Sequence, residues 1–341
     1  HAGHPFVDAL IKYNKLGYAL SHYVNSEGLK LGPDGRLHAQ WKITGSRTGR
    51  WTSEPSLLNW PKTMRSAVVA PPGRKFVGGD QAQLEMRIMA SLSGDANLIH
   101  KCATADEKDK LNPDCDPHSF VASLVFGKTY TDLDRNDPKH YKAAPGQKKC
   151  KCQRCQRDAL RDIVKRVVYG LNYGAGAATV LEAIYDGGYD GDPLTVQFIE
   201  RVTGIYFKAF PGVPIWRDRT LQTAQAEREV RSPLYRRRRI FPLGGIEPAV
   251  VYNYPIQSGG ADVMARGLMR LWPRLRLLDP TADIIAQVHD AIYIECAEDK
   301  AEAVAALLEE CMSFEMSLSP GAPPMPYVMK AKIGDHWQAV C

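Results

Sequence analysis

The feature that most constrains the fold is a pair of alternating segments joined by only two residues. Residues 283–288 and 291–296 alternate apolar and polar side chains, and only His289 and Asp290 separate them. This pattern predicts an antiparallel β-hairpin. A two-residue hairpin turn favours Asn-Gly or another glycine-rich pair, which His-Asp does not supply. The turn is therefore either a slightly strained hairpin with a solvated aspartate or a functional site.

A second carboxylate stands at the end of another predicted strand. Residues 76–79 are an apolar and glycine run that ends at Asp80, and a helical pattern follows through Arg87. Asp80 and Gln83 fit a helix capping box, which is the structural alternative. The functional alternative is a Mg²⁺ ligand, because a carboxylate fixed at a strand end offers the oxygen atoms that this ion prefers.

A third cluster combines cations, aromatic rings and glycines on one helix. The side chains recur at steps of four, with a glycine after each ring: Arg161, Lys165, Tyr169, Gly170, Tyr173 and Gly174. Steps of four keep side chains on one broad helical face. Two cations, stacking rings and bare backbone suit a nucleoside triphosphate. The alternative, a cationic amphipathic helix with core tyrosines, leaves two costly glycines unexplained.

The rest of the chain mixes helical and strand patterns and contains no repeat, so the predicted class is α+β. Residues 100–157 are polar and broken by prolines, which indicates an inserted or peripheral segment. Helices are expected over residues 5–25, 160–184, 195–210, 214–228, 260–272 and 300–316, and a strand over 327–333.

Charge favours a polyanionic partner without proving one. The net charge is +6 with a pI near 8.8, and four consecutive arginines occupy residues 236–239. This run precedes a short apolar segment, so it is either a solvated turn or a phosphate-binding strand. No stretch reaches the ~18 apolar residues of a membrane span, and His1 opens no signal-peptide pattern. We expect an intracellular protein, in the cytoplasm or nucleoid or in a host's cytoplasm if viral, that extends upstream of His1.

In this order, the three clusters resemble motifs A, B and C of the family A DNA polymerases, which include bacterial repair polymerases and phage replicases. Residues 48–53 (TGRWTS) and 57–61 (LLNWP) are similar to the family's TGR…LQNIP segment. Residues 253–262 (NYPIQSGGAD) resemble its NxPIQGxAAD segment, and 332–337 (KIGDHW) resemble its C-terminus. The resemblance spans nearly the whole chain.

The resemblance implies a right-hand fold with an antiparallel-sheet palm, helical fingers and most of the thumb missing. Residues 1–65 would end the thumb and begin the palm, and 66–99 would carry motif A. The inserted segment 100–157 and residues 158–228 would form the fingers, and 229–341 would complete the palm. No proofreading domain is expected in this chain.

The implied activity is template-directed addition of dNTPs to a primer 3′ end, with two Mg²⁺ ions held by Asp80 and Asp290. The residues implied to bind the dNTP are Arg161, Lys165, Tyr169, Glu85 and Gln81, with Glu85 excluding the ribose 2′-hydroxyl. Those implied to contact primer–template DNA are Arg50, Tyr173, Gly174, Asn253, Gln257 and His289. The expected partners are primer–template DNA, dNTPs, upstream domains and an unidentified processivity factor, with no membrane.

Three positions depart from the family pattern. Gln81 stands where the family often has Tyr, Ala291 where many members have a second acid, and Ala249 where some have an Arg. A single-subunit RNA polymerase or a non-catalytic DNA-binding accessory subunit remains as an alternative. Glu85 argues against the first, and the retained Asp80 and Asp290 argue against the second.

A cysteine cluster lies outside the resemblance. Cys150, Cys152 and Cys155 fall within six residues of the inserted segment, flanked by lysines and arginines. Such a group either holds a structural Zn²⁺ or forms a basic loop with free thiols that touches DNA. The fourth ligand is expected to be Cys115 or Cys102, ahead of His140.

Overall fold

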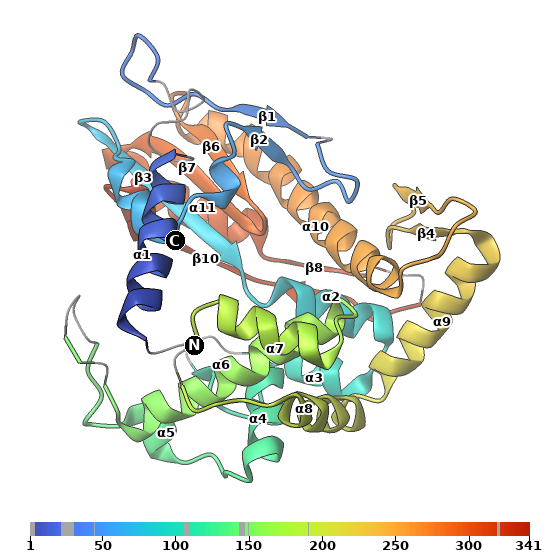
Figure 1. Cartoon of the computed structure of the whole chain (residues 1–341). Coiled ribbons are helices and arrows are strands. Elements are labelled where there is room, and N and C mark those ends of the chain that lie inside the picture. Colours follow the sequence, from blue (N-terminus) through green and yellow to red (C-terminus); the bar gives the residue numbers. More distant parts are fainter. Residues whose placement is uncertain are drawn as a thin grey trace. The chain divides into compact units, whose positions relative to one another are not determined.

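The computed structural model describes residues 4–21, 31–43, 45–105, 109–142, 147–148, 150–189, 191–318 and 321–341, apart from the side chains of residues 8, 15, 62 and 63. The chain forms two compact units (Figure 1). The first contains residues 1–80, 273–308 and 331–341, and the second contains residues 81–272 and 309–330. The end of the helix expected over residues 5–25 lies outside the described residues.

The first unit is built on a sheet. Its elements are α1 (Pro5–Ala19), β1 (Gln40–Lys42), β2 (Thr52–Glu54), η3 (Leu57–Asn59), η4 (Lys62–Ala67), β3 (Arg74–Gln81), β6 (Asp283–Val288), β7 (Ala291–Ala297), η6 (Glu298–Lys300), most of α11 (Ala301–Met312), most of β10 (Met329–Gly334) and η7 (Trp337–Val340). The strand order is β10-β3-β7-β6, and β7 pairs antiparallel with both β3 and β6.

The predicted hairpin is confirmed. Val288 pairs with Ala291, so β6 and β7 are joined by two residues, and His289 at the turn has a φ of 56°. Gly78 on β3 lies opposite Tyr293, and a Cβ there would come 2.7 Å from the tyrosine Cδ1. The glycine therefore lets the central strands and the Tyr293 ring pack closely.

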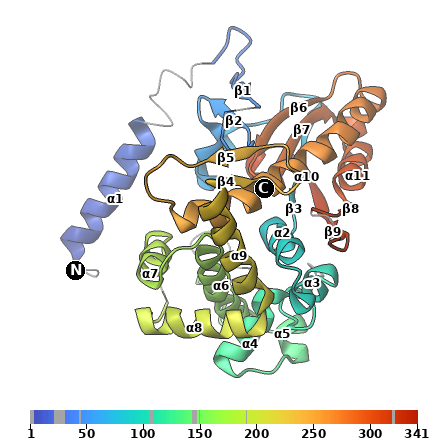
Figure 2. The same ribbon diagram turned by 90° about the vertical axis from the view of Figure 1, so that its right-hand side faces the viewer.

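The second unit is mainly helical. Its elements are α2 (Leu84–Ser93), α3 (Ala96–Ala103), α4 (Pro117–Phe126), α5 (Asp132–Asn136), α6 (Gln153–Asn172), α7 (Ala177–Asp186), α8 (Val196–Ala209), α9 (Gly212–Glu227), β4 (Glu229–Arg231), β5 (Arg238–Ile240), most of α10 (Pro248–Leu278), β8 (Phe314–Met316) and β9 (Met325–Tyr327). Helix α6 packs against α4, α7 and α8 (Figure 2), and its apolar face contributes to the main core.

Three helices differ from the sequence prediction. The helix expected over 300–316 ends at Met312, because Phe314–Met316 form strand β8 and pair with β9 instead. The expected helix over 160–184 is divided into α6 and α7, because Gly174 adopts a φ of 77° after the first of them. Helix α10 spans 31 residues and includes Pro255. A Cβ at Gly259 would lie 3.2 Å from Ile88 of α2, so this glycine permits close helix packing that outweighs the low local helix propensity.

Candidate functional site

The two predicted metal-binding carboxylates lie at the same end of the two central strands, β3 and β7, of the sheet in the first unit. Asp80 on β3 pairs with Ala291, the first residue of β7, and Asp290 directly precedes Ala291 in the turn. Asp80 is exposed and Asp290 is partly exposed. Strand pairing thus brings together two acids that are 210 positions apart in the sequence.

The helix-capping interpretation of Asp80 is wrong. Helix α2 begins at Leu84 with Gln83 as its N-cap, and Asp80 still belongs to β3. Gln83 has a φ of 50°, and its side chain amide donates to Asp116 instead of capping the helix. The acid at the strand end therefore remains available for another role.

The turn that carries Asp290 has an uncommon backbone. His289 occupies the left-handed region, which few residues other than glycine adopt. Histidine is one of the non-glycine residues found there more often. Such strain costs about 1–3 kcal/mol and concentrates at functional sites. The turn is strained, as the first of the two sequence interpretations required, and it also holds the second acid beside β3.

Glu295, farther along β7, belongs to an ion-pair cluster that the sequence did not predict. Its carboxylate accepts hydrogen bonds from the guanidinium groups of Arg36 and Arg74 at 2.9–3.0 Å. Burial acts to raise the pKa of Glu295, but the two arginines outweigh it and the pKa is lowered. Glu295 is therefore neutralised by structural partners.

The cationic face of α6 is present in the second unit. Lys165 Nζ lies 5.6 Å from the centre of the Tyr169 ring, within range of a cation–π interaction. Burial, and then the nearby charge of Arg161, lower the pKa of Lys165. A partly buried cation next to an aromatic ring is a suitable receptor for a phosphate group.

Arg161 is held by an acid that the sequence analysis missed. Its Nε and Nη2 donate to the two carboxylate oxygens of Asp116 at 3.0 and 2.7 Å. Asp116 is the N-cap of α4 and also accepts from the backbone N–H of Ser119. The bidentate pair fixes the guanidinium plane. The sequence signal was Asp-Pro-His, a strong helix start with a polar residue in its first turn.

His118, in that first turn, is the second missed residue. It is 1% exposed, its ring lies 5.7 Å from that of Tyr169, and neither ring nitrogen has a hydrogen-bond partner within the described part of the chain. Burial lowers the pKa of His118 to about 3, so the ring is neutral at physiological pH. Unsatisfied buried polar atoms beside Lys165 and Tyr169 are typical of a ligand-binding position.

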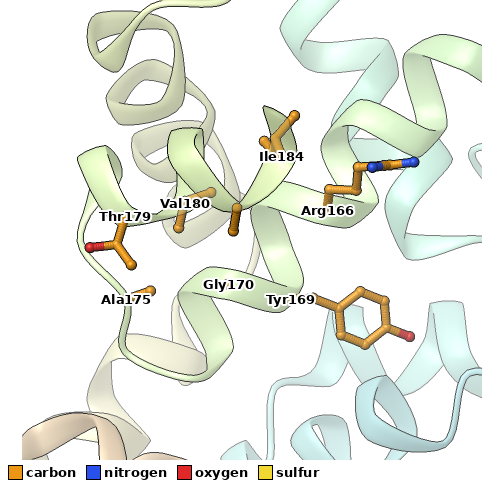
Figure 3. A pocket seen from close by; sticks show the side chains of 8 residues that line it. Arg166, Tyr169, Gly170, Ala175, Thr179, Val180 and Ile184 are labelled. Carbon is orange, nitrogen blue, oxygen red and sulfur yellow. The ribbon is translucent and has the colours of Figure 1, made fainter. Parts of the chain in front are cut away.

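Gly170 in α6 and Gly174 just after its end both have packing reasons. A Cβ at Gly170 would lie 2.7 Å from Val180 of α7, and one at Gly174 would lie 3.0 Å from the backbone of Ala249. A cavity of about 320 Å³ adjoins Gly170 between α6 and α7 (Figure 3). Its lining is mainly apolar and does not include Arg161 or Lys165. This cavity therefore does not provide a triphosphate site.

The structure places the other expected dNTP-binding residues on or near α2. Gln81 is buried, and its amide nitrogen donates to the carbonyl of Met312 at 2.7 Å. Through this contact, Gln81 helps to hold the residues just before α2 against the end of α11. Glu85 lies in the first turn of α2 and is partly exposed.

The expected DNA-contacting residues are distributed over both units. Arg50 follows the turn at Gly49 in the first unit, which also contains His289. In the second unit, Asn253 and Gln257 are one turn apart on α10, and both are partly exposed. Tyr173 is the C-cap of α6.

The arginine run at residues 236–239 leads into strand β5, and several of its side chains pair with acids of the same unit. Arg236 and Arg237 both donate to one carboxylate oxygen of Asp262 at 2.9 Å, and Arg238 pairs with Glu229 across the β4–β5 hairpin. Asp262 is buried on α10, and burial raises its pKa despite the two arginines. Two of the cations therefore anchor the hairpin to α10.

A His/Cys cluster occupies the start of α6. His140, Cys150, Cys152 and Cys155 have ligand atoms that all lie within 4.8 Å of one another. The expectation of Cys115 as the fourth ligand is wrong, because its thiol faces the carbonyls of Asp109 and Asn112 instead.

Cys102 is also excluded from the cluster. It is fully buried in the main core, where burial raises its pKa to about 12. His140, the last of the three candidates, takes the fourth position.

Comparison with known proteins identifies the family to which the chain belongs. The sequence model of DNA polymerase family A matches residues 1–145 and 140–339. The chain is 30% identical over 349 residues to the thermostable DNA polymerase I of Thermus filiformis, and 29% identical over 325 residues to DNA polymerase I of Chloroflexus aurantiacus. These alignments cover 98% and 91% of the chain but only 36% and 30% of the relatives.

A solved structure supports the same assignment. The POL domain of Pol1 from M. smegmatis, in complex with DNA primer-template and dNTP, matches with a TM-score of 0.74 and 26% identity over 99% of this chain and 54% of that one. The fold is therefore the right-hand fold of the polymerases. The chain belongs to DNA polymerase family A, which confirms the resemblance seen in the sequence. None of the described helices is both long and apolar enough to cross a bilayer.

Proposed function

We propose that this chain is the polymerising part of a DNA polymerase that adds dNTPs to a primer 3′ end by two-metal-ion nucleotidyl transfer. The observation that carries the proposal is the placement of Asp80 and Asp290 at the same end of β3 and β7 in a member of this family. One carboxylate at the end of β3 and one in the adjacent β6–β7 turn form a donor set of hard oxygens, which fits Mg²⁺. When bound, a pair of such ions would activate the primer hydroxyl and neutralise the triphosphate.

The residues of the chain would then position the reactants. Asp80 and Asp290 would bind the ions. Arg161, oriented by Asp116, and Lys165 would hold the triphosphate, and Tyr169 would pack on the incoming sugar and base. Phosphoryl transfer requires mainly such positioning and charge neutralisation. Lys165 is partly buried and its pKa is lowered by that burial, so a bound phosphate would gain a poorly hydrated cation as its partner.

Other residues would select the substrate and hold the DNA. Glu85 would exclude ribonucleotides, and Gln81 would support the nucleotide pocket through its bond to Met312. The residues proposed to contact primer–template are Arg50, Tyr173, Gly174, Asn253, Gln257 and His289. The M. smegmatis structure, which contains primer-template and dNTP, supports these partners by analogy.

We further propose that this chain does not proofread and acts inside the cell. None of the eight cysteines forms a disulfide, which is typical of reducing compartments.

Primer extension tests the proposed function. We expect Mg²⁺-dependent extension with dNTPs and little with rNTPs. Asp290→Asn should reduce kcat by about 10³-fold or more, since a metal ligand contributes several kcal/mol to the transition state. It should leave primer–template binding, measured by fluorescence anisotropy, nearly unchanged.

The matched control is Asp283→Asn at the other end of the same hairpin. Asp283 has an exposed side chain that forms a surface ion pair with Arg276, so its loss should leave kcat within about twofold. Full activity of Asp290→Asn would refute the assignment of the acids. Preference for rNTPs would favour the RNA polymerase alternative, and DNA binding without extension would favour the accessory subunit.

A further inference from the structure

Four potential metal ligands meet at the start of α6, in the polar and proline-broken segment of residues 100–157. His140 comes from a turn after α5, and the three cysteines come from the residues that lead into α6 and from its first turn. Cys152 is the N-cap of the helix and is buried, and Cys150 and Cys155 are partly exposed. The site therefore joins two stretches of chain ten or more residues apart.

The spacing of the ligand atoms fits one tetrahedral ion. His140 Nδ1 lies 3.6 Å from Cys152 Sγ and 3.3 Å from Cys155 Sγ. A tetrahedral Zn²⁺ with the usual bond lengths places a nitrogen and a sulfur ligand about 3.6 Å apart and two sulfurs about 3.8 Å apart. The measured contacts match the first value closely, and the whole set lies within 4.8 Å.

The surrounding backbone holds the ligands in this arrangement. The Asp137 carboxylate accepts from the backbone N–H of Lys139, next to His140, and at 2.8 Å from that of Gln153, next to Cys152. One side chain thus ties together the turn and the helix start that supply the ligands. The sulfur of Cys150 lies 3.6 Å from the backbone carbonyl oxygen of Lys139, which also neighbours His140. Outer hydrogen bonds of this kind orient metal ligands.

A disulfide or a free-thiol loop explains the cluster less well. A disulfide would join two of the sulfurs and leave the third sulfur and the imidazole without a reason to converge. A basic loop that touches DNA would not need a buried Cys152. The inserted segment is polar and broken by prolines, so it contains little apolar surface with which to order itself.

We propose that His140, Cys150, Cys152 and Cys155 bind one structural Zn²⁺ that fixes the inserted segment to the start of α6. The three thiols release their protons to solvent on binding, and the neutral imidazole coordinates through Nδ1. Four protein ligands close the coordination sphere, so the site has no open position for substrate.

The ion would stabilise contacts that lie between α5 and α6. Gln153 and Arg154 donate to Thr131 and to the carbonyl of Arg135, and Arg157 lies 3.8 Å from the buried Asp134. Arg161 is one turn farther along the same helix. Zinc would thus hold the N-terminal end of the helix that presents the proposed triphosphate-binding residues.

Metal analysis of the full chain, purified in reductant without chelator, tests the proposal. We expect about one zinc per chain, reduced to below about a tenth in Cys152→Ser. Cys115→Ser is the matched control, because this thiol lies in the same segment but outside the cluster, and it should retain the zinc. Zinc absent from the wild type, or lost equally in both variants, would overturn the proposal.

Cobalt substitution provides a second measurement that does not depend on the folding of Cys152→Ser. Reduced, zinc-free wild type titrated with Co²⁺ should show the visible absorption of a tetrahedral site and thiolate charge transfer at one equivalent. His140→Cys should bind with increased charge-transfer absorption, as a fourth thiolate replaces the imidazole. An octahedral spectrum without thiolate bands, or a spectrum unchanged in His140→Cys, would contradict the ligand set.

Hydrogen exchange shows whether the ion is structural. Removal of zinc should accelerate exchange in residues 131–142 and 150–157 by roughly tenfold or more, while β3 and β7 keep their protection. Equal exchange with and without zinc would rule out the structural role. These readouts do not involve polymerisation, so the proposed function and the zinc site can fail independently.

Discussion

The buried pair of Asp116 and Arg161 gives the sharpest test of how α6 is held. Asp116 is 0% and Arg161 is 8% exposed. The carboxylate accepts four hydrogen bonds of 2.7–3.0 Å, two from Arg161 and one each from Ser119 and Gln83. Asp116→Ala would leave the guanidinium buried without its counter-charge, which costs about 3–5 kcal/mol.

The same substitution removes the N-cap of α4, worth about 1 kcal/mol, and the two losses overlap because they involve one carboxylate. We therefore expect Asp116→Ala to destabilise α4 and α6 by about 4 kcal/mol. Asp114→Ala is the matched control. Its side chain is 94% exposed and lies 3.9 Å from Lys101, so its loss should cost less than about 0.5 kcal/mol.

Native-state hydrogen exchange at several urea concentrations is the appropriate assay, because a chain of two units need not unfold in one step. Protection in α4 and α6 should decrease while that in β6 and β7 is unchanged. The double variant Asp116→Asn/Arg161→Met should recover at least about 1.5 kcal/mol relative to the sum of the single variants. A cost below about 1 kcal/mol for Asp116→Ala, or additive single variants, would refute the reasoning.

Two further predictions concern the same unit. Tyr169→Phe should increase discrimination against dideoxynucleotides by roughly tenfold, because the variant lacks the tyrosine hydroxyl and one lost hydrogen bond has about this effect. Competition assays of chain termination measure the change, and unchanged discrimination would remove Tyr169 from the sugar site. Burial acts to raise the pKa of Asp116, but Arg161 outweighs it and the folded pKa lies below the reference value of 3.8. The pair's contribution to stability is therefore complete above that value and lost as the pH falls through the lower folded pKa. Acid unfolding of α4 and α6, followed by hydrogen exchange, should depend less steeply on pH in Asp116→Asn than in the wild type, and equal slopes would contradict this.

The elements that sequence predicted well are those whose signal is local. The hairpin at residues 283–296 was evident from alternation alone, and its unfavourable turn residues correctly indicated strain at His289. The α6 face was evident from steps of four. The proximity of Asp80 and Asp290 was inferred from the family resemblance, because no local sequence pattern indicates that β3 and β7 are neighbours.

The misses involve partners that are distant in sequence. Arg161 and Asp116 are 45 positions apart, and nothing near either residue identifies the other. The sequence placed Cys115 and Cys102 ahead of His140 as the fourth ligand, but the fold brings the His140 imidazole to the three thiols instead. Gly170 was attributed to function alone, but contact with Val180 gives it a packing role.

Helix α6 is held in place by different kinds of contact along its length. Its first turn belongs to the His/Cys cluster, and its second and third turns contribute Arg157 and Arg161, whose buried acidic partners precede the helix in sequence. Beyond Arg161, the Tyr169 ring lies next to Lys165 and next to the ring of His118, and neither of these two contacts is an ion pair. The helix then packs against Val180 of α7 at Gly170, ends at Asn172 and is followed by the turn at Gly174. Charge pairs therefore fix the half of α6 that must stay in place, and weaker aromatic contacts hold the half that would adjust to a nucleotide. This division is consistent with the triphosphate-binding role proposed for Arg161, because its bidentate pair with Asp116 uses the Nε and Nη2 edge of the guanidinium and leaves the Nη1 edge to face another group.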